Sequence, residues 1–408
     1  MIRKKIAIIG AGPAGLACAE LLTKQKDVPV EVTVFEQMPS AARKFLMAGK
    51  TGLNISHNES FEQFVSRYDD PCWLKPMLEQ CKADDIQHWM HGLGIDSYIG
   101  SSGRIFPNEM KAAPLLRAWL KRLQTQGVHF LYKHQCTHLK NKALSYTDLK
   151  LQQQHTVVFD AIVLACGAVS WPQLGSDGQW QHWLEPQHIN TFLPSNVGMT
   201  VTWSEFMTAS FGQPLKRIQA WSQGQEKQFG EMVISHYGLE GGLVYRCNRQ
   251  LREQFQNNAN DANTSPLLFL DLLPDLTIEQ IVQKLQQGQK QSLNTRWQKL
   301  GLDKTKIALL REVVNKSDWS DHEKMASFIK KLPIHIQGFR PITEAISCAG
   351  GVKKTALTQN LQFKQYSGLF ACGEMLDWDA PTGGYLLTAC LATGQHVAKG
   401  VVMYLQNT

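Results

Sequence analysis

A short glycine-rich turn near the N-terminus constrains this chain more than any other stretch. Residues 4–15 read KKIAIIGAGPAG, in which the apolar run 6–9 is typical of a buried parallel strand. The run leads into Gly10-x-Gly12-x-x-Gly15, and apolar residues at helical spacing follow. The glycines therefore mark a strand-to-helix turn. Gly10 permits the tight turn, Gly12 lets a pyrophosphate approach the backbone, and Gly15 lets the helix pack against the strand.

A second strand after the turn favours dinucleotide binding. Residues 30–35, VEVTVF, are rich in β-branched side chains, and Glu36 follows them directly. A dinucleotide-binding unit needs a carboxylate here to accept hydrogen bonds from ribose hydroxyls. The N-terminus of the intervening helix would offer free N–H groups to the phosphates. One alternative stays open, a flavodoxin-like glycine turn that holds no dinucleotide.

The composition indicates an ordinary globular protein. The chain has 408 residues, 43% hydrophobic and 19% charged, which is long enough for about two or three domains. Its net charge is +7, but the basic residues are scattered and the longest run is Arg3-Lys4-Lys5. A solvated surface explains this pattern better than a nucleic-acid footprint does. Nucleic-acid binding is therefore not favoured.

The cysteines and histidines show no metal-binding or redox pattern. Nine cysteines form no CxxC pair, and thirteen histidines show no HExxH spacing. We therefore expect no metal site and buried thiols in a reducing cytoplasm.

The first residues imitate a secretory signal, with MIRKK, an apolar stretch and ACA. We reject that interpretation because Gly10, Gly12, Pro13 and Gly15 would break its apolar helix. No other segment reaches the roughly 18 apolar residues of a membrane helix. The sequence thus predicts a soluble cytoplasmic protein without a membrane partner.

The segments after Glu36 extend the same domain. Residues 37–58 are polar and rich in donors that could reach phosphate and ring atoms, although a solvated loop is an alternative: Arg43, Lys44, Lys50, Thr51 and Asn54. Further on, the patterns predict short helices over 60–92, a hairpin over 97–107 and a crossover helix over 112–126. They then predict a third parallel strand at 128–133, an antiparallel excursion over 134–159 and a buried strand at 159–168. Together these segments predict a doubly wound sheet.

The middle of the chain has a different sequence pattern. Residues 186–273 contain short strand-like runs without helical periodicity, residues 277–330 are helical, and residues 332–339 return as a strand. The last 65 residues resemble the first domain again, because a strand ends in Gly373-Glu374 and Gly383-Gly384 precedes a long apolar helix. We therefore expect three domains: a discontinuous nucleotide-binding domain of 1–185 and 346–408, a β-rich domain of 186–273 and 332–345, and a helical domain of 274–331.

Six stretches together resemble a known family. They are IAIIGAGPAGLACAELL with Glu36, ARKFLMAGKTGLNIS, GRIFPNEMKAAPLLRAWL, FDAIVLACGAVSWPQLGSDG, FRPITEAISCAGGV and GLFACGEMLDWDAPTGGYLLTACLATG. The set resembles the bacterial FAD-binding flavoproteins described as aminoacetone-oxidase-like, or as NAD(P)/FAD-dependent oxidoreductases. The resemblance covers almost the whole chain in order. It implies an α/β fold of the two-dinucleotide-binding-domain flavoprotein type, with a discontinuous Rossmann-like FAD domain, an inserted β-rich domain and a small helical domain.

The resemblance also implies how FAD is held. The glycine turn would hold the pyrophosphate and Glu36 the adenosine ribose, while residues 49–54 would lie against the flavin and 383–386 beneath its ring. We expect Gly384 to lack a side chain because backbone N–H groups there contact the flat ring. The full expected cofactor-binding set is Gly10, Gly12, Pro13, Ala14, Gly15, Glu36, Gln37, Arg43, Lys44, Thr51, Gly52, Asn54, Cys136, Ala165, Gly167, Gly373, Glu374, Asp377, Gly383, Gly384, Tyr385 and Leu386.

The leading functional hypothesis is an FAD-dependent oxidoreductase that acts on a small molecule. The sequence names neither that substrate nor a catalytic residue, and it does not indicate the oligomeric state. Only one GxGxxG motif is present, so NAD(P)H, if it is the electron donor, would have to dock transiently. Two alternatives stay open: an FAD-containing RNA-modifying or nucleic-acid-associated protein, and a protein in which FAD serves structure or sensing.

Overall fold

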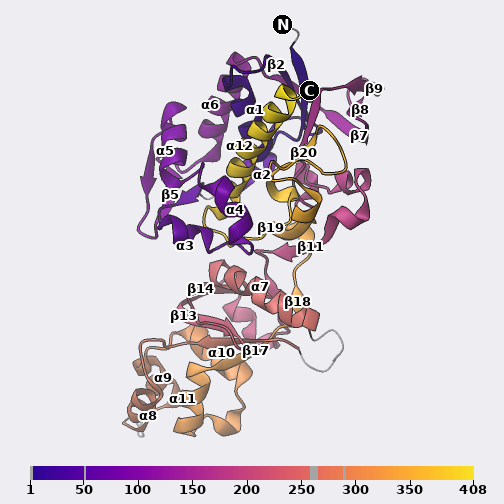
Figure 1. Cartoon of the computed structure of the whole chain (residues 1–408). Helices are drawn as coiled ribbons and strands as arrows, with labels where there is room; N and C mark the ends of the chain where they lie inside the picture. The colour runs from indigo at the N-terminus through magenta and orange to yellow at the C-terminus, as the bar shows by residue number, and fades with distance from the viewer. Residues whose placement is uncertain (1–2, 50–51, 258–264, 288–290) are drawn as a thin grey trace. The chain divides into compact units, whose positions relative to one another are not determined.

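The computed structural model describes residues 3–49, 52–257, 265–287 and 291–408. The chain divides into two compact units (Figure 1). Unit 1 contains Met1–Leu193 and Ser347–Thr408, and unit 2 contains Pro194–Ile346. Both ends of the chain therefore fold into one unit. The predicted class is confirmed, because unit 1 has a Rossmann-like parallel sheet and an antiparallel β domain is inserted into it.

Unit 1 is built on a five-stranded parallel sheet of order β20-β10-β1-β2-β6. Its strands are β1 (Lys4–Ile9), β2 (Val30–Glu36), β6 (His129–Tyr132), β10 (Ala161–Leu164) and β20 (Leu369–Ala371). β1 lies at the centre, and its residues 6–9 are buried, as expected of an apolar strand covered on both faces. β20 comes from the C-terminal segment, so the sheet needs both ends of the chain.

α1 (Pro13–Lys24) and α12 (Tyr385–Gln406) pack against this sheet. The other helices of unit 1 are α2 (Arg43–Ala48), α3 (Phe61–Val65), α4 (Pro71–Leu78), α5 (Ala83–Gly92) and α6 (Ala112–Thr125). α12 lies against α1 (Figure 1). The contact is very close, because a Cβ placed on Gly394 of α12 would lie 2.2 Å from the carbonyl oxygen of Ala14 in α1. Glycine at this position thus lets the C-terminal helix pack directly on the backbone of the glycine-turn helix.

Two small antiparallel sheets complete unit 1. One joins β3 (Ser56–His57), β5 (Arg104–Pro107) and β4 (Ser97–Ile99), and the other joins β7 (His134–Lys140), β8 (Ala143–Asp148) and β9 (Gln153–Val158). A further two-stranded sheet joins β11 (Ile189–Ser195) with β19 (Ser347–Val352). The β4–β5 pair confirms the predicted hairpin, and the β7–β9 sheet confirms the antiparallel excursion.

Unit 2 combines a seven-stranded sheet with helices. The sheet order is β17-β16-β13-β14-β15-β12-β18. Its strands are β12 (Met199–Thr200), β13 (Pro214–Ser222), β14 (Gln228–Ser235), β15 (Gly238–Glu240), β16 (Leu267–Asp271), β17 (Leu332–His335) and β18 (Gly338–Phe339), and its helices are α7 (Gly242–Asn257), α8 (Ile278–Gln286), α9 (Leu293–Leu300), α10 (Lys304–Val313) and α11 (His322–Lys330).

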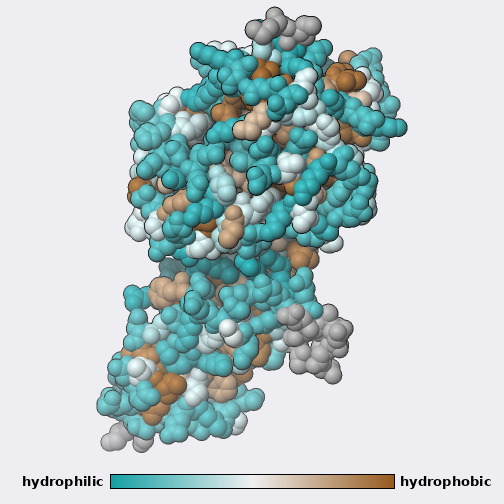
Figure 2. Space-filling view, viewed as in Figure 1, coloured by the Kyte–Doolittle hydropathy of each residue, from teal (hydrophilic) through white to brown (hydrophobic). Residues whose placement is uncertain are grey.

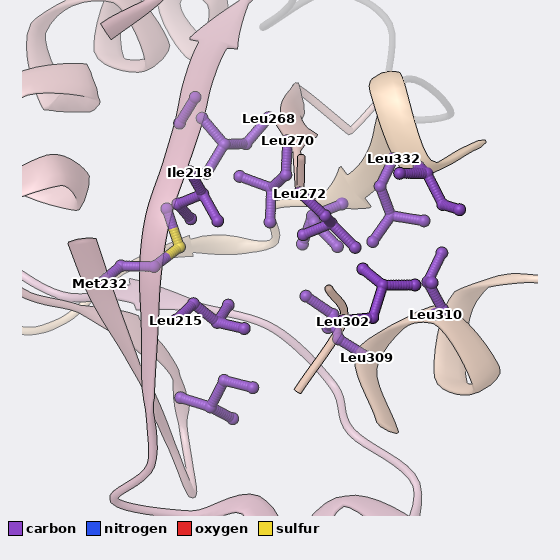
Figure 3. Packing of buried hydrophobic residues seen from close by; sticks show 14 of the residues in the cluster. Leu215, Ile218, Met232, Leu268, Leu270, Leu272, Leu302, Leu309, Leu310 and Leu332 are labelled. Atoms are coloured by element: carbon purple, nitrogen blue, oxygen red, sulfur yellow. The ribbon is translucent and has the colours of Figure 1, made fainter. Parts of the chain in front are cut away.

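The structure differs from the expected domain division in unit 2. Strands and helices share one hydrophobic cluster, in which Ile218 and Leu270 of the sheet face Leu309 and Leu310 of α10 (Figure 3). Side chains buried in one common core fold as one unit. Residues 274–331 therefore belong with the sheet rather than in a helical domain of their own.

α7 is a second difference. Residues 186–273 are expected to lack helical periodicity, yet Gly242–Asn257 forms a helix of 16 residues. Its buried residues Val244, Cys247 and Leu251 recur at helical spacing and pack on the sheet. The Asn248 side chain is also buried, where its Oδ1 accepts a hydrogen bond from the Val197 N–H at 2.7 Å. The short periodic run was concealed among polar and charged residues.

The visible surface is mostly hydrophilic (Figure 2). Its apolar patches are small and scattered, as is normal for folded proteins. Within the described residues, no helix is both long and apolar enough to cross a membrane.

A buried carboxylate connects three helices of unit 1. Glu20 of α1 accepts hydrogen bonds from Trp89 Nε1 of α5 at 3.0 Å and from Trp119 Nε1 of α6 at 2.8 Å. It also pairs with Arg122 Nη1 at 3.0 Å and Lys24 Nζ at 2.6 Å. Burial favours the neutral acid, but the bonds from Lys24, Arg122 and Trp89 outweigh it and lower the Glu20 pKa.

Replacing this carboxylate should destabilise unit 1. Glu20→Gln is expected to lower the free energy of unfolding by roughly 3–5 kcal/mol at pH 7, the usual cost of breaking a buried ion pair. Because the folded pKa is lowered, the stabilisation is present above the ordinary value of 4.5 and is lost as the pH falls through the folded pKa. Urea unfolding at pH 7 and at low pH measures both effects. Glu79→Gln, on the surface after α4, serves as the control, and equal stability of the two variants would contradict the assignment.

Candidate functional site

A pocket in unit 1 lies where the parallel strands end. Gly10 follows β1, Glu36 ends β2, Ala165 follows β10 and Gly373 follows β20, and all four line it. The carboxyl edge of a parallel sheet is the usual place for a ligand in this fold class. The pocket brings together thirteen of the residues expected from the sequence: Gly10, Gly12, Pro13, Ala14, Glu36, Gln37, Arg43, Lys44, Cys136, Ala165, Gly167, Gly373 and Glu374.

The glycine turn has the geometry that its spacing predicts. Gly10 has φ +107°, and a Cβ there would lie 2.3 Å from the Ala165 carbonyl oxygen. A Cβ on Gly15 would lie 2.1 Å from the carbonyl oxygen of Gly10, so strand and helix meet here without room for a side chain. Around Gly12 no described heavy atom lies within 4 Å of a built Cβ. Gly12 therefore keeps the pocket open at the start of α1.

Glu36 is held at the end of β2 by backbone donors. Its Oε2 accepts from the Ala11 N–H at 3.1 Å and its Oε1 from the Met38 N–H at 2.9 Å. Burial raises the Glu36 pKa, and these two hydrogen bonds together with nearby Arg43 oppose that rise. A carboxylate has about four acceptor positions, so roughly two remain for a ligand.

One wall of the pocket was not predicted from the sequence. The Gln37 amide donates to the Gly175 carbonyl at 2.9 Å and to Asp177 Oδ2 at 3.2 Å, which ties β2 to the loop after β10. The Ser176 hydroxyl in this loop is buried and has no partner among the described residues. The further lining residues include Cys166, Gly175, Ser176, Asp177, Trp180 and Trp183. Cys166, Gly175, Ser176 and Asp177 lie in the stretch 159–178 that carries the family resemblance, but no cofactor role was predicted for them.

Two cations of α2 face the pocket differently. Arg43 has a buried Nε without a partner among the described residues, so one donor is left for a ligand. Lys44 is already paired, with Glu374 Oε2 at 2.8 Å and the Ser170 hydroxyl at 2.6 Å. The Lys44–Glu374 pair joins residues 330 positions apart and closes the pocket between α2 and the segment after β20.

The expected flavin-side residues lie outside this pocket. Gly15, Gly52, Asn54, Asp377, Gly383, Gly384, Tyr385 and Leu386 do not line it, and Thr51 lies outside the described residues. Asn54 nevertheless has a buried Oδ1 without a partner in the described chain. Asp377 accepts from Asn190 Nδ2 at 2.6 Å, and burial raises the Asp377 pKa. The pocket therefore contains only part of the expected set.

The reason expected for Gly384 needs a correction. Gly384 is the N-cap of α12 with φ +98°, and a Cβ there would lie 2.5 Å from Ser56 Cα. The backbone of β3 thus already excludes a side chain without any ligand. A substitution at Gly384 would disturb the apoprotein and cannot report on a cofactor alone.

Tyr385 belongs to a polar cluster at the start of α12. Its hydroxyl donates to Glu59 Oε1 at 2.6 Å, and Arg67 Nη2 pairs with Glu59 Oε2 at 2.7 Å. Burial and the neighbouring Glu59 carboxylate raise the Tyr385 pKa. The ring of His57 stacks on that of Tyr385 with centroids 5.8 Å apart. These contacts hold the helix start against β3 and against the residues on either side of α3.

The described residues do not meet the requirements of a metal site, and Cys136 does not meet those of a reactive cysteine. No group of three or more His, Cys, Asp or Glu side chains there could hold a metal ion. Cys136 lines the pocket, and burial raises the pKa of its thiol. A protonated thiol of this kind is a poor nucleophile.

Known proteins resemble this chain over most of its length. The family described as "HI0933-like protein Rossmann domain" matches residues 4–400. The chain is 24% identical to a 3-dehydro-bile acid delta(4,6)-reductase of Clostridium scindens, over 96% of this chain and 97% of the relative. It is also 24% identical to a ribosomal RNA dihydrouridine synthase of Haemophilus influenzae, over 93% of each.

Solved structures share the fold. A variant of E. coli quinol fumarate reductase FrdA superposes with a TM-score of 0.52 at 12% identity, over 99% of this chain and 71% of that chain. This likeness concerns the fold alone. The family match spans nearly the whole chain and confirms the predicted resemblance. The chain therefore belongs to the HI0933-like family of FAD-dependent Rossmann oxidoreductases.

Proposed function

We propose that this protein is an FAD-dependent reductase that adds two hydrogens across a C=C bond conjugated to a carbonyl group. The observation that carries the proposal is the reaction shared by the two curated relatives, whose names are a delta(4,6)-reductase of 3-dehydro bile acids and a dihydrouridine synthase. Dihydrouridine is uridine with its ring C=C bond reduced. In both cases the reduced C=C bond is conjugated to a carbonyl group, although a steroid and a nucleotide have little else in common.

The described pocket fits the adenosine diphosphate half of FAD. Gly12 leaves room at the N-terminus of α1, where first-turn N–H groups have no acceptor within the helix. Glu36 keeps acceptor positions for ribose hydroxyls, and Arg43 Nε and the Ser176 hydroxyl are buried without partners in the described chain. When bound, FAD supplies the hydride chemistry of such a reduction.

The protein's own groups would bind and orient the cofactor. The positive end of α1 and the guanidinium of Arg43 favour the diphosphate charge. Gln37 holds the loop with Gly175 and Asp177 over the pocket, and the Lys44–Glu374 pair fixes the opposite side. In this proposal, these groups position FAD.

Electron donor and location complete the proposal. We propose NAD(P)H as the reductant, docking transiently because the chain has a single GxGxxG motif. The substrate is a small-molecule enone. All nine cysteines are free thiols in the structure, which suits a reducing cytoplasm.

The similarity to the ribosomal RNA dihydrouridine synthase favours one second candidate, reduction of a uracil base in RNA. Its reaction on the base would be the same, and only the recognition of the substrate would differ. The scattered charge of +7 does not favour it.

Glu36 gives the first test of FAD binding. Glu36→Ala should weaken FAD binding by roughly 1–3 kcal/mol, because ribose hydroxyls lose their acceptor. Isothermal titration of the apoprotein with FAD measures the change. Glu31→Ala, on the same strand but outside the pocket, is the control. The assignment fails if the two variants bind FAD equally well, or if FMN is the flavin extracted from the wild-type protein.

Replacing Arg43 should change FAD binding without changing the stability of the fold. Arg43→Met should leave the free energy of unfolding of the apoprotein within about 1 kcal/mol, because Nε loses no partner in the described structure. FAD affinity should fall about ten- to a hundredfold, as for a lost hydrogen bond to a charged group. Thermal melts and FAD titration provide the two readouts, with Arg117→Met on the exposed face of α6 for comparison. Unchanged FAD affinity would place the diphosphate elsewhere.

Anaerobic stopped-flow spectroscopy tests the reaction. NADH or NADPH should bleach the flavin absorbance, and a 3-keto-4-ene steroid or a simple cyclic enone should restore it with formation of the saturated ketone. Restoration by uridine-containing RNA but by no enone would select the second candidate. If amines reduce the oxidised flavin while no C=C acceptor reoxidises the reduced protein, the proposed reaction is wrong.

A further inference from the structure

A second cavity lies in unit 1, at the opposite end of the parallel sheet from the dinucleotide pocket. Its lining includes Lys142 in the turn between β7 and β8, Ile162 near the start of β10, and Leu369 at the start of β20. Its volume is about 510 Å³. This lies within the range of small-molecule sites, roughly 300–1,000 Å³. The proposed FAD binding does not use it.

The charge of this cavity is positive. Lys140 and Lys142 line it, and its described lining contains no Asp or Glu. The Lys142 ammonium lies 3.4 Å from the Tyr404 hydroxyl and over the Tyr404 ring. Tyr404 therefore holds the Lys142 side chain in place without neutralising its charge. Asn141 and Lys142 have φ of 47° and 63°, and this tight turn holds both lysines at one edge of the cavity.

Glu185 bonds to two lining residues of the cavity, Gln365 and Tyr366. Neither Glu185 nor Asp160 is ion-paired with Lys140 or Lys142 within the described residues. Glu185 accepts hydrogen bonds from Gln365 Nε2 at 2.9 Å and from Gln187 Nε2 at 2.6 Å. Asp160 accepts from the Lys5 N–H at 2.7 Å, and its other oxygen lies 3.6 Å from Lys4 Nζ. The two lysines of the cavity are therefore available to an incoming anion.

The remaining lining suits a flat ring. Trp183 and Tyr366 supply aromatic side chains, and Leu139, Ile162 and Leu369 supply apolar ones. Asn141, Gln365 and Ser367 add polar groups, of which the Gln365 amide donates to Glu185 and the Ser367 hydroxyl is bonded to Tyr404. The cavity therefore suits a ligand that has an anionic group, a planar ring and a few polar atoms at the edge of that ring.

We propose that this cavity binds a mononucleotide, with the phosphate between Lys140 and Lys142 and the base against Trp183 or Tyr366. Lysine ammonium groups bind phosphate as point charges, and aromatic side chains stack on bases of any sequence. Trp183 also lines the dinucleotide pocket, so the two sites share one side chain. The inference does not depend on which substrate the flavin reduces.

The test is calorimetric titration of AMP into the FAD-saturated protein, so that the adenosine diphosphate site is already filled. Lys140→Glu reverses an exposed charge, and Lys142→Met removes a charge while keeping the stem that packs near Tyr404. Lys150→Glu is the matched control, because it lies in the turn at the other end of β8 and outside the cavity. Flavin absorbance after ultrafiltration and the melting temperature verify that each variant is folded and still loaded.

AMP should bind at least tenfold more tightly than adenosine or inorganic phosphate alone. Lys140→Glu and Lys142→Met should each weaken AMP binding at least fivefold, and Lys150→Glu should leave it unchanged. The proposal is overturned if AMP gives no saturable binding at millimolar concentration. It is also overturned if adenosine binds as well as AMP, or if both lysine variants bind AMP like the wild type.

Discussion

The packing of backbone on backbone at the start of α1 is the constraint on which unit 1 depends. Gly15 brings α1 onto the carbonyl of Gly10, and Gly394 brings α12 onto the carbonyl of Ala14. A Cβ on Gly373 would lie 2.7 Å from Ala14 Cβ, so the segment after β20 is close to the same turn. A side chain at any of these positions would separate the elements. The pocket exists because three distant parts of the chain meet at one helix start.

Charge in the pocket is arranged around that turn. Glu36 and Glu374 bring two carboxylates to a site proposed for an anionic diphosphate, and each is compensated locally. Backbone N–H groups hold Glu36, and Lys44 pairs with Glu374. The positive end of α1 and the guanidinium of Arg43 are then left for the ligand. In the proposed complex, this division would let the acids accept hydrogen bonds from hydroxyl groups without repelling the phosphates.

The similarity to other flavoproteins separates what the fold provides from what selects a substrate. A fumarate reductase subunit shares the fold at 12% identity, and two curated relatives at 24% identity act on very different molecules. A fold can host many functions, since function depends on individual sites. The proposed reduction of a conjugated C=C bond therefore rests on what the two relatives' reactions have in common.

The sequence by itself determined the features that are local. The glycine turn, Glu36, the hairpin of 97–107 and the crossover helix all follow from short-range spacing, because sterics and periodicity act within a few residues. It missed α7, although Val244, Cys247 and Leu251 had helical spacing, because the buried Asn248 and many polar neighbours weakened that pattern. Only the tertiary structure decided that Ser176 and Asp177 wall the pocket, that Lys44 pairs with Glu374, and that Ser56 rather than a flavin excludes a side chain at Gly384. These contacts join residues far apart in the chain, and their partners are set by sheet order and helix packing, which no local pattern encodes.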